Sequence, residues 1–245
     1  MRNLKLIVQY DGTDYAGFQV QPDRPTVQGV LEAALSKVLQ HEARVTSASR
    51  TDAGVHAIGQ VVTVQTDNPI EVRRLARATN DALPLAVSIA EAEEVSAAFH
   101  PRYDAVGKLY CYRILNRETP SPFICRYAWH IRRPLDLEGM QVAAEQLLGT
   151  HDFTSFEATG GCIRTKTRCL WRLDCQRFGD GVVEIRAEAE GFLYMMVRNI
   201  VGTLVEVGVG RFGAETLAPI LEARDRSVAG PTAPPQGLCL VRVDY

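Results

Sequence analysis

Apolar residues recur every three or four positions in four segments of the chain, which is the spacing of a helix that buries one face. The segments with this spacing are residues 27–38, 69–83, 137–148 and approximately 194–207. Thr26 and Asp136 precede two of these segments and are residue types that cap the amino ends of helices. Pro84 ends the second segment, and Gly149 stands where the third helix is expected to end. The pattern therefore predicts four helices.

Runs rich in β-branched and aromatic residues predict strands between these helices. The expected strands cover residues 5–10, 44–49, 60–66, 85–89, 108–115, 170–178, 182–189 and 238–243. Two of them flank Gly179-Asp180-Gly181, which is a strong signal for a hairpin. Explicit hairpins, with two helices in each half of the chain, favour an α+β fold with largely antiparallel sheets over a doubly wound parallel sheet.

The length of 245 residues allows one large domain or two small ones. The arrangement of predicted elements places a seam near Pro101 to Ala105. We therefore expect one half over residues 1–103 and the other over residues 104–245. The sequence has no apolar run long enough for a transmembrane helix and no segment resembling a signal peptide, so we expect a cytoplasmic protein.

The distribution of charge is more informative than its sum, a formal net charge of −2. Residues 98–133 contain seven Lys or Arg and two Asp or Glu, and residues 161–177 contain five and one. Two basic stretches on a mildly acidic chain are typical of a positive surface that faces a polyanion such as RNA. An ordinary solvated face would give the same pattern, and charge alone leaves both interpretations open.

The six cysteines do not indicate a metal site or a disulfide framework. No C-x-x-C pair is present, and Cys162, Cys169 and Cys175 lack partners at zinc spacing. We expect all six to be reduced thiols, partly buried as small apolar side chains. Motifs for a phosphate-binding loop, a dinucleotide site, a zinc protease and a nucleophile elbow are also absent.

The segment from Ser49 to Ala57 is the most informative part of the chain, because it lies between two predicted strands. In an extended segment Arg50 and Asp52 point to the same side, and the cation would keep the carboxylate ionised as a nucleophile or electrostatic stabiliser. The ordinary interpretation is a turn in which Asp52 binds backbone amides. His56 without a second histidine at metal spacing is expected to be structural.

Two further places in the second half could carry function. Lys108, Tyr110 and Tyr112 share one face of a predicted strand, where aromatic rings with a basic neighbour could stack bases and hold phosphates. The alternative is an aromatic pair within a sheet, although we expect Tyr112 to be exposed to solvent. Arg198 is expected on the flank of the fourth helix, where an arginine usually extends to solvent unless a buried carboxylate needs a partner.

A resemblance to a known family extends these observations. The segment Arg50-Thr51-Asp52-Ala53-Gly54-Val55-His56-Ala57 resembles the signature of the tRNA pseudouridine synthase A family. Other matching positions, in the family's order, are Tyr10-Asp11-Gly12-Thr13, Asn80 with Leu83-Pro84, Phe99-His100-Pro101-Arg102, Lys108 with Tyr110 and Tyr112, His151-Asp152-Phe153 with Phe156, and Met196-Val197-Arg198-Asn199-Ile200-Val201-Gly202. Phe18 departs from the usual Trp and Ser49 from the usual Gly, and neither is part of the reacting group.

The resemblance implies isomerisation of uridine to pseudouridine at positions 38, 39 and 40 in the anticodon arm of tRNA, without cofactor or metal. It implies that Asp52 is the nucleophile, that Arg50 holds open the space left by the flipped uridine, and that Tyr110 stacks on that base. Arg198 would pair with Asp52. The implied architecture is a homodimer of chains with two related α/β halves, whose sheets join across a central RNA-binding cleft. The alternatives are a non-catalytic RNA-binding protein of this fold and a nucleoside or glycoside hydrolase.

Overall fold

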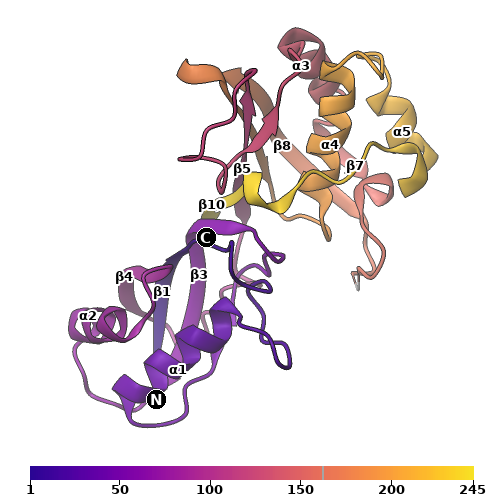
Figure 1. Ribbon diagram of the computed structural model, residues 1–245. Helices are drawn as coiled ribbons and strands as arrows, with labels where there is room; N and C mark the ends of the chain where they lie inside the picture. The colour runs from indigo at the N-terminus through magenta and orange to yellow at the C-terminus, as the bar shows by residue number, and fades with distance from the viewer. Residues whose placement is uncertain (162) are drawn as a thin grey trace. The chain divides into compact units, whose positions relative to one another are not determined.

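The computed structural model describes residues 1–161 and 163–245, which form two compact units (Figure 1). Unit 1 comprises residues 1–106 and 239–245, and unit 2 comprises residues 107–238. Unit 1 thus extends three residues beyond the predicted boundary at residue 103, and residues 239–245 belong to unit 1 rather than to the second half of the chain. The reason is a long-range strand pairing, in which Cys239 and Leu240 lie opposite His56 and Ala57. The local sequence around the seam carries no signal for such a pairing.

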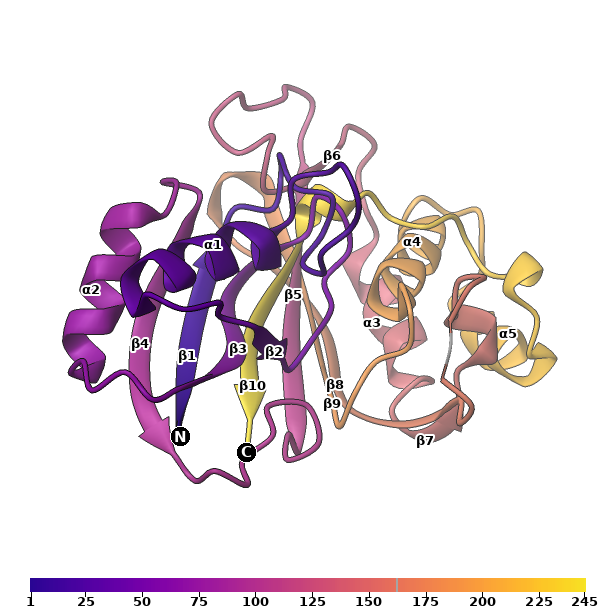
Figure 2. The same ribbon diagram turned by 90° about the horizontal axis from the view of Figure 1, so that it is seen from below.

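Unit 1 is a sheet with two helices. Its strands lie in the order β4-β1-β3-β10, and β2 pairs with β3. The strands are β1 (Arg2–Tyr10), β2 (Val45–Ser47), β3 (His56–Thr66), β4 (Val87–Val95) and β10 (Leu238–Asp244), and the helices are α1 (Val27–Leu39) and α2 (Val72–Ala82). All pairs are antiparallel except β3 with β10, which is parallel. Figure 2 shows α1 and α2 on the same face of this sheet.

The hydrophobic pattern accounts for this packing. Leu4, Leu6 and Val8 alternate along β1 and are fully buried on one face of the sheet. The predicted cap of α1 is confirmed, because the Gly29 N–H donates to Thr26 Oγ1 at 3.2 Å. Helix α2 begins at Val72 rather than at Pro69.

Strand β4 is longer than the sequence indicates. The predicted strand ends at Ile89, because the following residues are mainly alanine and glutamate, which are uncommon in strands. The strand lies at the edge of the sheet and continues to Val95. The extension pairs with β1 as far as Val95 opposite Asn3. Cross-strand charges add to this pairing, since Lys5 Nζ lies 2.9 Å from Glu93 Oε1 and Arg2 bonds Glu94 at 2.8 Å.

The strands of unit 2 are mainly antiparallel and lie in the order β5-β9-β8-β7, with β6 parallel to β5. Its strands are β5 (Gly107–Asn116), β6 (Trp129–Ile131), β7 (Gly149–Asp152), β8 (Thr167–Arg177) and β9 (Val182–Ala189). The predicted hairpin is confirmed between β8 and β9, where Asp180 and Gly181 have φ angles of 61° and 76°. The two short strands β6 and β7 were not predicted.

Three helices belong to unit 2: α3 (Leu137–Glu145), α4 (Met196–Gly208) and α5 (Leu217–Ala223). Asp136 caps α3 as predicted, accepting from the Gly139 N–H at 3.0 Å. This helix ends three residues earlier than predicted, so Gly149 lies in β7 rather than at the helix end. The last residues tighten into i→i+3 bonds, such as that from the Leu148 N–H to Glu145 O at 3.2 Å.

Helix α4 is buried on every side rather than along one apolar stripe. The segment 229–234, which we call the strap, covers part of it. Gly202 makes this approach possible, because a Cβ there would lie 1.6 Å from Pro231 O. The mixture of helices with largely antiparallel sheets confirms the predicted α+β class. Within residues 1–161 and 163–245, no helix has the length and hydropathy to cross a membrane.

Candidate active site

The loop from Ser49 to Val55, which we call the Asp52 loop, connects β2 to β3 in unit 1. Its side chains alternate in exposure as an extended segment requires, because Thr51 is buried while Arg50 is exposed and Asp52 is half-buried. A turn follows, closed by a hydrogen bond from the Val55 N–H to Asp52 O at 3.1 Å. The loop therefore turns the side chains of Arg50 and Asp52 toward solvent while its neighbours are packed inside.

Two glycines allow the backbone of unit 1 to pack directly on this loop. A Cβ on Gly12 would lie 2.0 Å from Val55 O, and a Cβ on Gly17 would lie 2.9 Å from Thr51 O. Gly17 also has a φ of +105°, which favours glycine. The Phe18 N–H donates to Thr51 O at 3.0 Å and reinforces the contact. In the sequence the residues around Gly12 contribute only to the family resemblance, and this close approach explains why glycine is needed there.

Replacing Gly12 with alanine tests this packing. Because the clash is with backbone, the loop must move, and we expect Gly12→Ala to lower the free energy of unfolding by about 1–3 kcal/mol. Gly179→Ala is the control, since a Cβ at Gly179 would meet nothing within 4 Å. Chemical denaturation measures both variants. Equal unfolding free energies for the two would show that the contact is not tight.

His56 helps to hold the same loop in place. It is buried, and its Nδ1 atom accepts from the Gly12 N–H at 3.1 Å and lies 3.2 Å from Asp11 Oδ1. Asp11 Oδ1 in turn accepts from the Thr13 N–H at 2.9 Å. These contacts make His56 a structural residue that joins the start of β3 to the turn after β1.

Tyr110 lies on β5 of unit 2 and is 7% exposed. It stands opposite Ala187 of β9, and its ring meets that of Phe192 edge-on at 5.2 Å between centroids. The prediction that Tyr112 is exposed is wrong. Tyr112 is completely buried, its hydroxyl donates to Pro234 O at 2.7 Å, and burial raises its pKa. The strap accepts from the hydroxyl, and Gly237, just after the strap, lies close to the ring. A strand pattern alone cannot indicate these distant contacts.

Arg198 is also buried, with 8% of its surface exposed, and so does not extend to solvent as an arginine on the flank of a helix usually does. Its Nε–H donates to Ala233 O at 2.8 Å, and the Ala233 N–H donates to Arg198 O at 3.1 Å. Asn199 fixes the strap, because its Oδ1 accepts from Thr232 Oγ1 at 2.6 Å and from Arg226 at 3.0 Å. The strap thus orients the guanidinium of Arg198.

Most cations of the second basic stretch have partners within the protein. Lys166 pairs with Glu157 and Arg172 with Asp174. The guanidinium of Arg168 donates to two backbone carbonyl oxygens, and that of Arg177 to the side chain of Asn116. Arg164 is exposed, and its side chain makes no hydrogen bond or ion pair with another described residue. Counting charges in the sequence therefore overstates the charge available to a polyanion.

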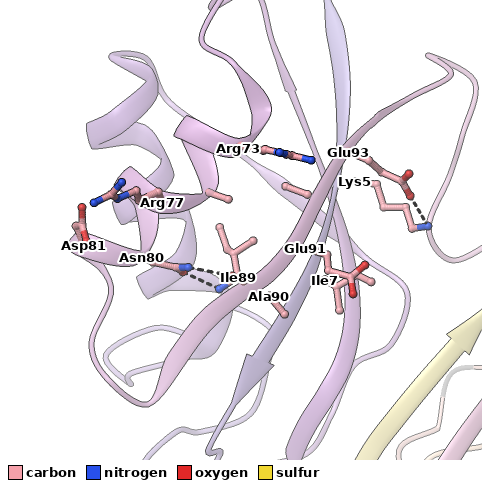
Figure 3. Close-up of a pocket in the computed structure, with 12 residues that line it drawn as sticks. Lys5, Ile7, Arg73, Arg77, Asn80, Asp81, Ile89, Ala90, Glu91 and Glu93 are labelled. Carbon is pink, nitrogen blue, oxygen red and sulfur yellow. Dashed lines mark hydrogen bonds and ion pairs between the residues drawn. The ribbon is translucent and has the colours of Figure 1, made fainter.

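A hollow of about 580 Å³ in unit 1 lies away from the Asp52 loop (Figure 3). It runs between α2 and β4 and is lined by charges of both signs, including Arg73, Arg77 and Glu91. The side-chain amide of Asn80 bonds both backbone groups of Ile89 there, at 2.7 and 2.9 Å. Asn80 thus ties α2 to β4, and the hollow includes none of the predicted site residues.

The described residues offer no cluster of three or more His, Cys, Asp or Glu side chains that could hold a metal ion. Five cysteines of the described residues form no disulfide, namely Cys111, Cys125, Cys169, Cys175 and Cys239. Cys162, which is also expected to be a thiol, lies outside the described residues. Burial raises the pKa of Cys175 to about 12, so this thiol is protonated at neutral pH.

Comparison with known proteins assigns the chain to a family. The profile of the tRNA pseudouridine synthase family matches residues 6–104 and 143–245, which include Asp52 and Arg198. A tRNA pseudouridine synthase A of Moorella thermoacetica is 47% identical over 244 residues, 99% of each chain. Those of Brevibacillus brevis and Thermoanaerobacter sp. are 46% and 44% identical over the full length of both chains. The chain belongs to the tRNA pseudouridine synthase family.

Comparison with solved structures gave weak similarities, which do not bear on this assignment. The crystal structure of a Cbf5-Nop10-Gar1 complex aligns with 96% of this chain and 57% of that chain, at a TM-score of 0.40 and 13% identity. A similarity of that size is too low to assign a fold.

Proposed function

We propose that this chain isomerises uridine to pseudouridine in tRNA, at positions 38, 39 and 40 of the anticodon arm. The observation that carries the proposal is the Asp52 loop, in which a half-exposed carboxylate stands on a backbone that glycine packing and hydrogen bonds hold in place. The names of the full-length relatives give the same activity and substrate.

The reaction breaks the bond between N1 of the base and C1′ of the ribose and forms a bond from C5 to the same C1′. The base stays in the site, C5 loses its proton and N1 gains one, so the reaction is an isomerisation that needs neither a redox group nor a water nucleophile. A carboxylate could trap C1′, add to C6 of the base, or take the 2′ proton to give a glycal. In each route one carboxylate is sufficient, whereas a glycosidase needs a second one to activate water. We assign this carboxylate to Asp52.

Three other residues complete the proposed site. Arg50, which is exposed next to Asp52, would hold the space from which the uridine has flipped. Tyr110 would stack on the flipped base and take the C5 proton. Arg198 would pair with Asp52 and keep it ionised, because a buried guanidinium oriented by the strap is a strong partner for a carboxylate.

The proposal includes a homodimer that works in the cytoplasm, with tRNA as its partner and with no cofactor or membrane. These parts rest on the family resemblance. Sedimentation velocity of the chain with and without tRNA tests the dimer. The dimer predicts a species with twice the mass of the chain when tRNA is absent, and that mass plus the mass of bound tRNA when it is present. A species with the mass of a single chain would contradict it.

Mapping of the product tests the proposed positions. Unmodified tRNA transcripts with uridine at 38, 39 or 40, one position at a time, are incubated with the protein, and pseudouridine is located by chemical labelling. We expect product at each of the three positions and none elsewhere in the tRNA. Pseudouridine only outside the anticodon arm would contradict the assignment of positions.

Salt dependence tests whether the exposed cations bind phosphates. Arg132 and Arg164 are exposed members of the two basic stretches. Reversing both to glutamate should weaken binding of every tRNA alike and flatten the slope of log K against log [salt] by about 0.7–0.9 for each phosphate that is no longer neutralised. The matched control reverses Arg73 and Arg77 on α2, which lie outside both stretches. An equal loss of affinity in both double variants would mean that binding follows net charge and not these stretches.

A further inference from the structure

At the start of the Asp52 loop, the side chain of Gln60 makes the hydrogen bonds that a neighbouring strand would otherwise make. The pairing of β2 with β3 ends with a hydrogen bond from the Ala48 N–H to Val61 O at 2.8 Å. At the next residue the Gln60 Nε2–H donates to Ser49 O at 2.8 Å, and the Ser49 N–H donates to Gln60 Oε1 at 3.2 Å. Gln60 is completely buried. One amide therefore satisfies both backbone groups of Ser49 and fixes the start of the loop.

A second contact holds the residue immediately before Asp52. The hydroxyl groups of Tyr10 and Thr51 lie 2.7 Å apart, and the Gln60 Nε2–H also points to Tyr10 Oη at 3.4 Å. Both Tyr10 and Thr51 are buried. Because the Phe18 N–H bonds Thr51 O, residue 51 is held through its side chain and its carbonyl. A buried network that joins β1, β3 and the loop thus ends one residue from the reacting carboxylate.

We propose that Gln60 and Tyr10 are positioning residues for Asp52, an inference that rests on the proposed function. Neither side chain needs to touch RNA. Their effect is to keep the carboxylate in one place while a flipped uridine is brought to it, since a displacement of about 1 Å can cost about 10²-fold in rate. The half-exposed Asp52 could otherwise move with its loop.

Four variants distinguish a loss of Asp52 positioning from a general loss of folding stability. Tyr10→Phe and Thr51→Val each remove one hydroxyl with little change of volume, Gln60→Met removes the amide, and the fourth variant combines Tyr10→Phe with Thr51→Val. The matched control is Thr66→Val, at the other end of β3. Thr66 is also buried, accepting from the Asn68 N–H at 3.0 Å, and its hydroxyl lies 2.7 Å from His41 Nε2. Loss of a buried hydrogen bond lowers stability at both ends of the strand, but only one end carries Asp52.

The experiment measures the single-turnover release of tritium from [5-³H]uridine-labelled tRNA at saturating protein, with the tRNA Kd and Tm measured separately. We expect the Tyr10, Thr51 and Gln60 variants to lose about 10- to 100-fold in rate with Kd within about twofold of wild type. Thr66→Val should keep the wild-type rate. The variant lacking both hydroxyls should be no slower than the slower single variant, because the two hydroxyls act as one contact.

Wild-type rates in Tyr10→Phe and Gln60→Met would overturn the inference while leaving the proposed function intact. Equal rate losses in Thr66→Val and Tyr10→Phe would also overturn it, because they would show a general effect of stability. A wild-type protein that releases no tritium would refute the proposed function itself. The outcomes are thus distinguishable within one set of measurements.

Discussion

Asp52→Asn protein should form no pseudouridine, yet it should bind tRNA almost as tightly as the wild type. An asparagine side chain keeps the size of the carboxylate but cannot act as an anionic nucleophile or base. The phosphate contacts proposed above come from exposed cations such as Arg132 and Arg164 and do not involve Asp52. The measurement is an activity assay beside a binding titration on the same preparation.

The matched control for this variant is Asp14→Asn. Asp14 lies on the same unit and is exposed, so the same chemical change there should leave the rate unchanged. Activity above background in pure Asp52→Asn protein would refute the assignment of Asp52 as the nucleophile. A large loss of tRNA binding in this variant would instead give Asp52 a role in recognition.

The second large effect is expected for Tyr110→Phe. Stacking on the flipped base needs only the ring, which the variant keeps, so tRNA binding should persist. Removal of the C5 proton needs the hydroxyl, and its loss should slow single turnover by about 10²–10⁴-fold, as is typical of a lost general acid or base. The variant keeps the ring that meets Phe192 edge-on, at 5.2 Å between centroids.

The choice of control depends on the structure. Tyr112, the neighbouring tyrosine on β5, is unsuitable because its hydroxyl is buried and bonds Pro234 O. Tyr103→Phe is appropriate, since Tyr103 is exposed and lies on unit 1. This control should keep the wild-type rate. A wild-type rate in Tyr110→Phe itself would mean that Tyr110 provides a stacking surface and no proton transfer.

Local signals were enough to predict most elements of the fold. Thr26 and Asp136 mark helix starts by their side chains, and Gly179-Asp180-Gly181 marks a hairpin by its backbone freedom. Each of these signals acts over a few residues, so the sequence contains all that is needed to see it.

Elements held by distant partners could not be predicted in the same way. The second half of β4 is a strand because its backbone pairs with β1 as far as Val95 opposite Asn3, against the local preference of its residues. Lys5 and Arg2 of β1 also pair with its glutamates. The burial of Arg198 and Tyr112 depends on the strap, which lies more than 30 residues away along the chain. Tertiary contacts outweigh local propensity at these positions.

The candidate site also combines features that local sequence predicts with features that depend on distant contacts. The signature around Asp52 is readable in the sequence, and its alternating exposure follows from an extended backbone. The support of the loop was not predicted, because Gln60 lies in a predicted strand as an unremarkable polar residue. Only the three-dimensional structure shows that its amide meets both backbone groups of Ser49.

The most direct test of the proposed function is to incubate the purified chain with [5-³H]uridine-labelled tRNA and to measure released tritium, free uracil and pseudouridine together. We predict tritium release matched one for one by pseudouridine in intact tRNA, with no free uracil. Free uracil would indicate a hydrolase built on Asp52. Tight binding of tRNA with neither tritium nor uracil released would indicate a non-catalytic RNA-binding protein and would contradict the central claim.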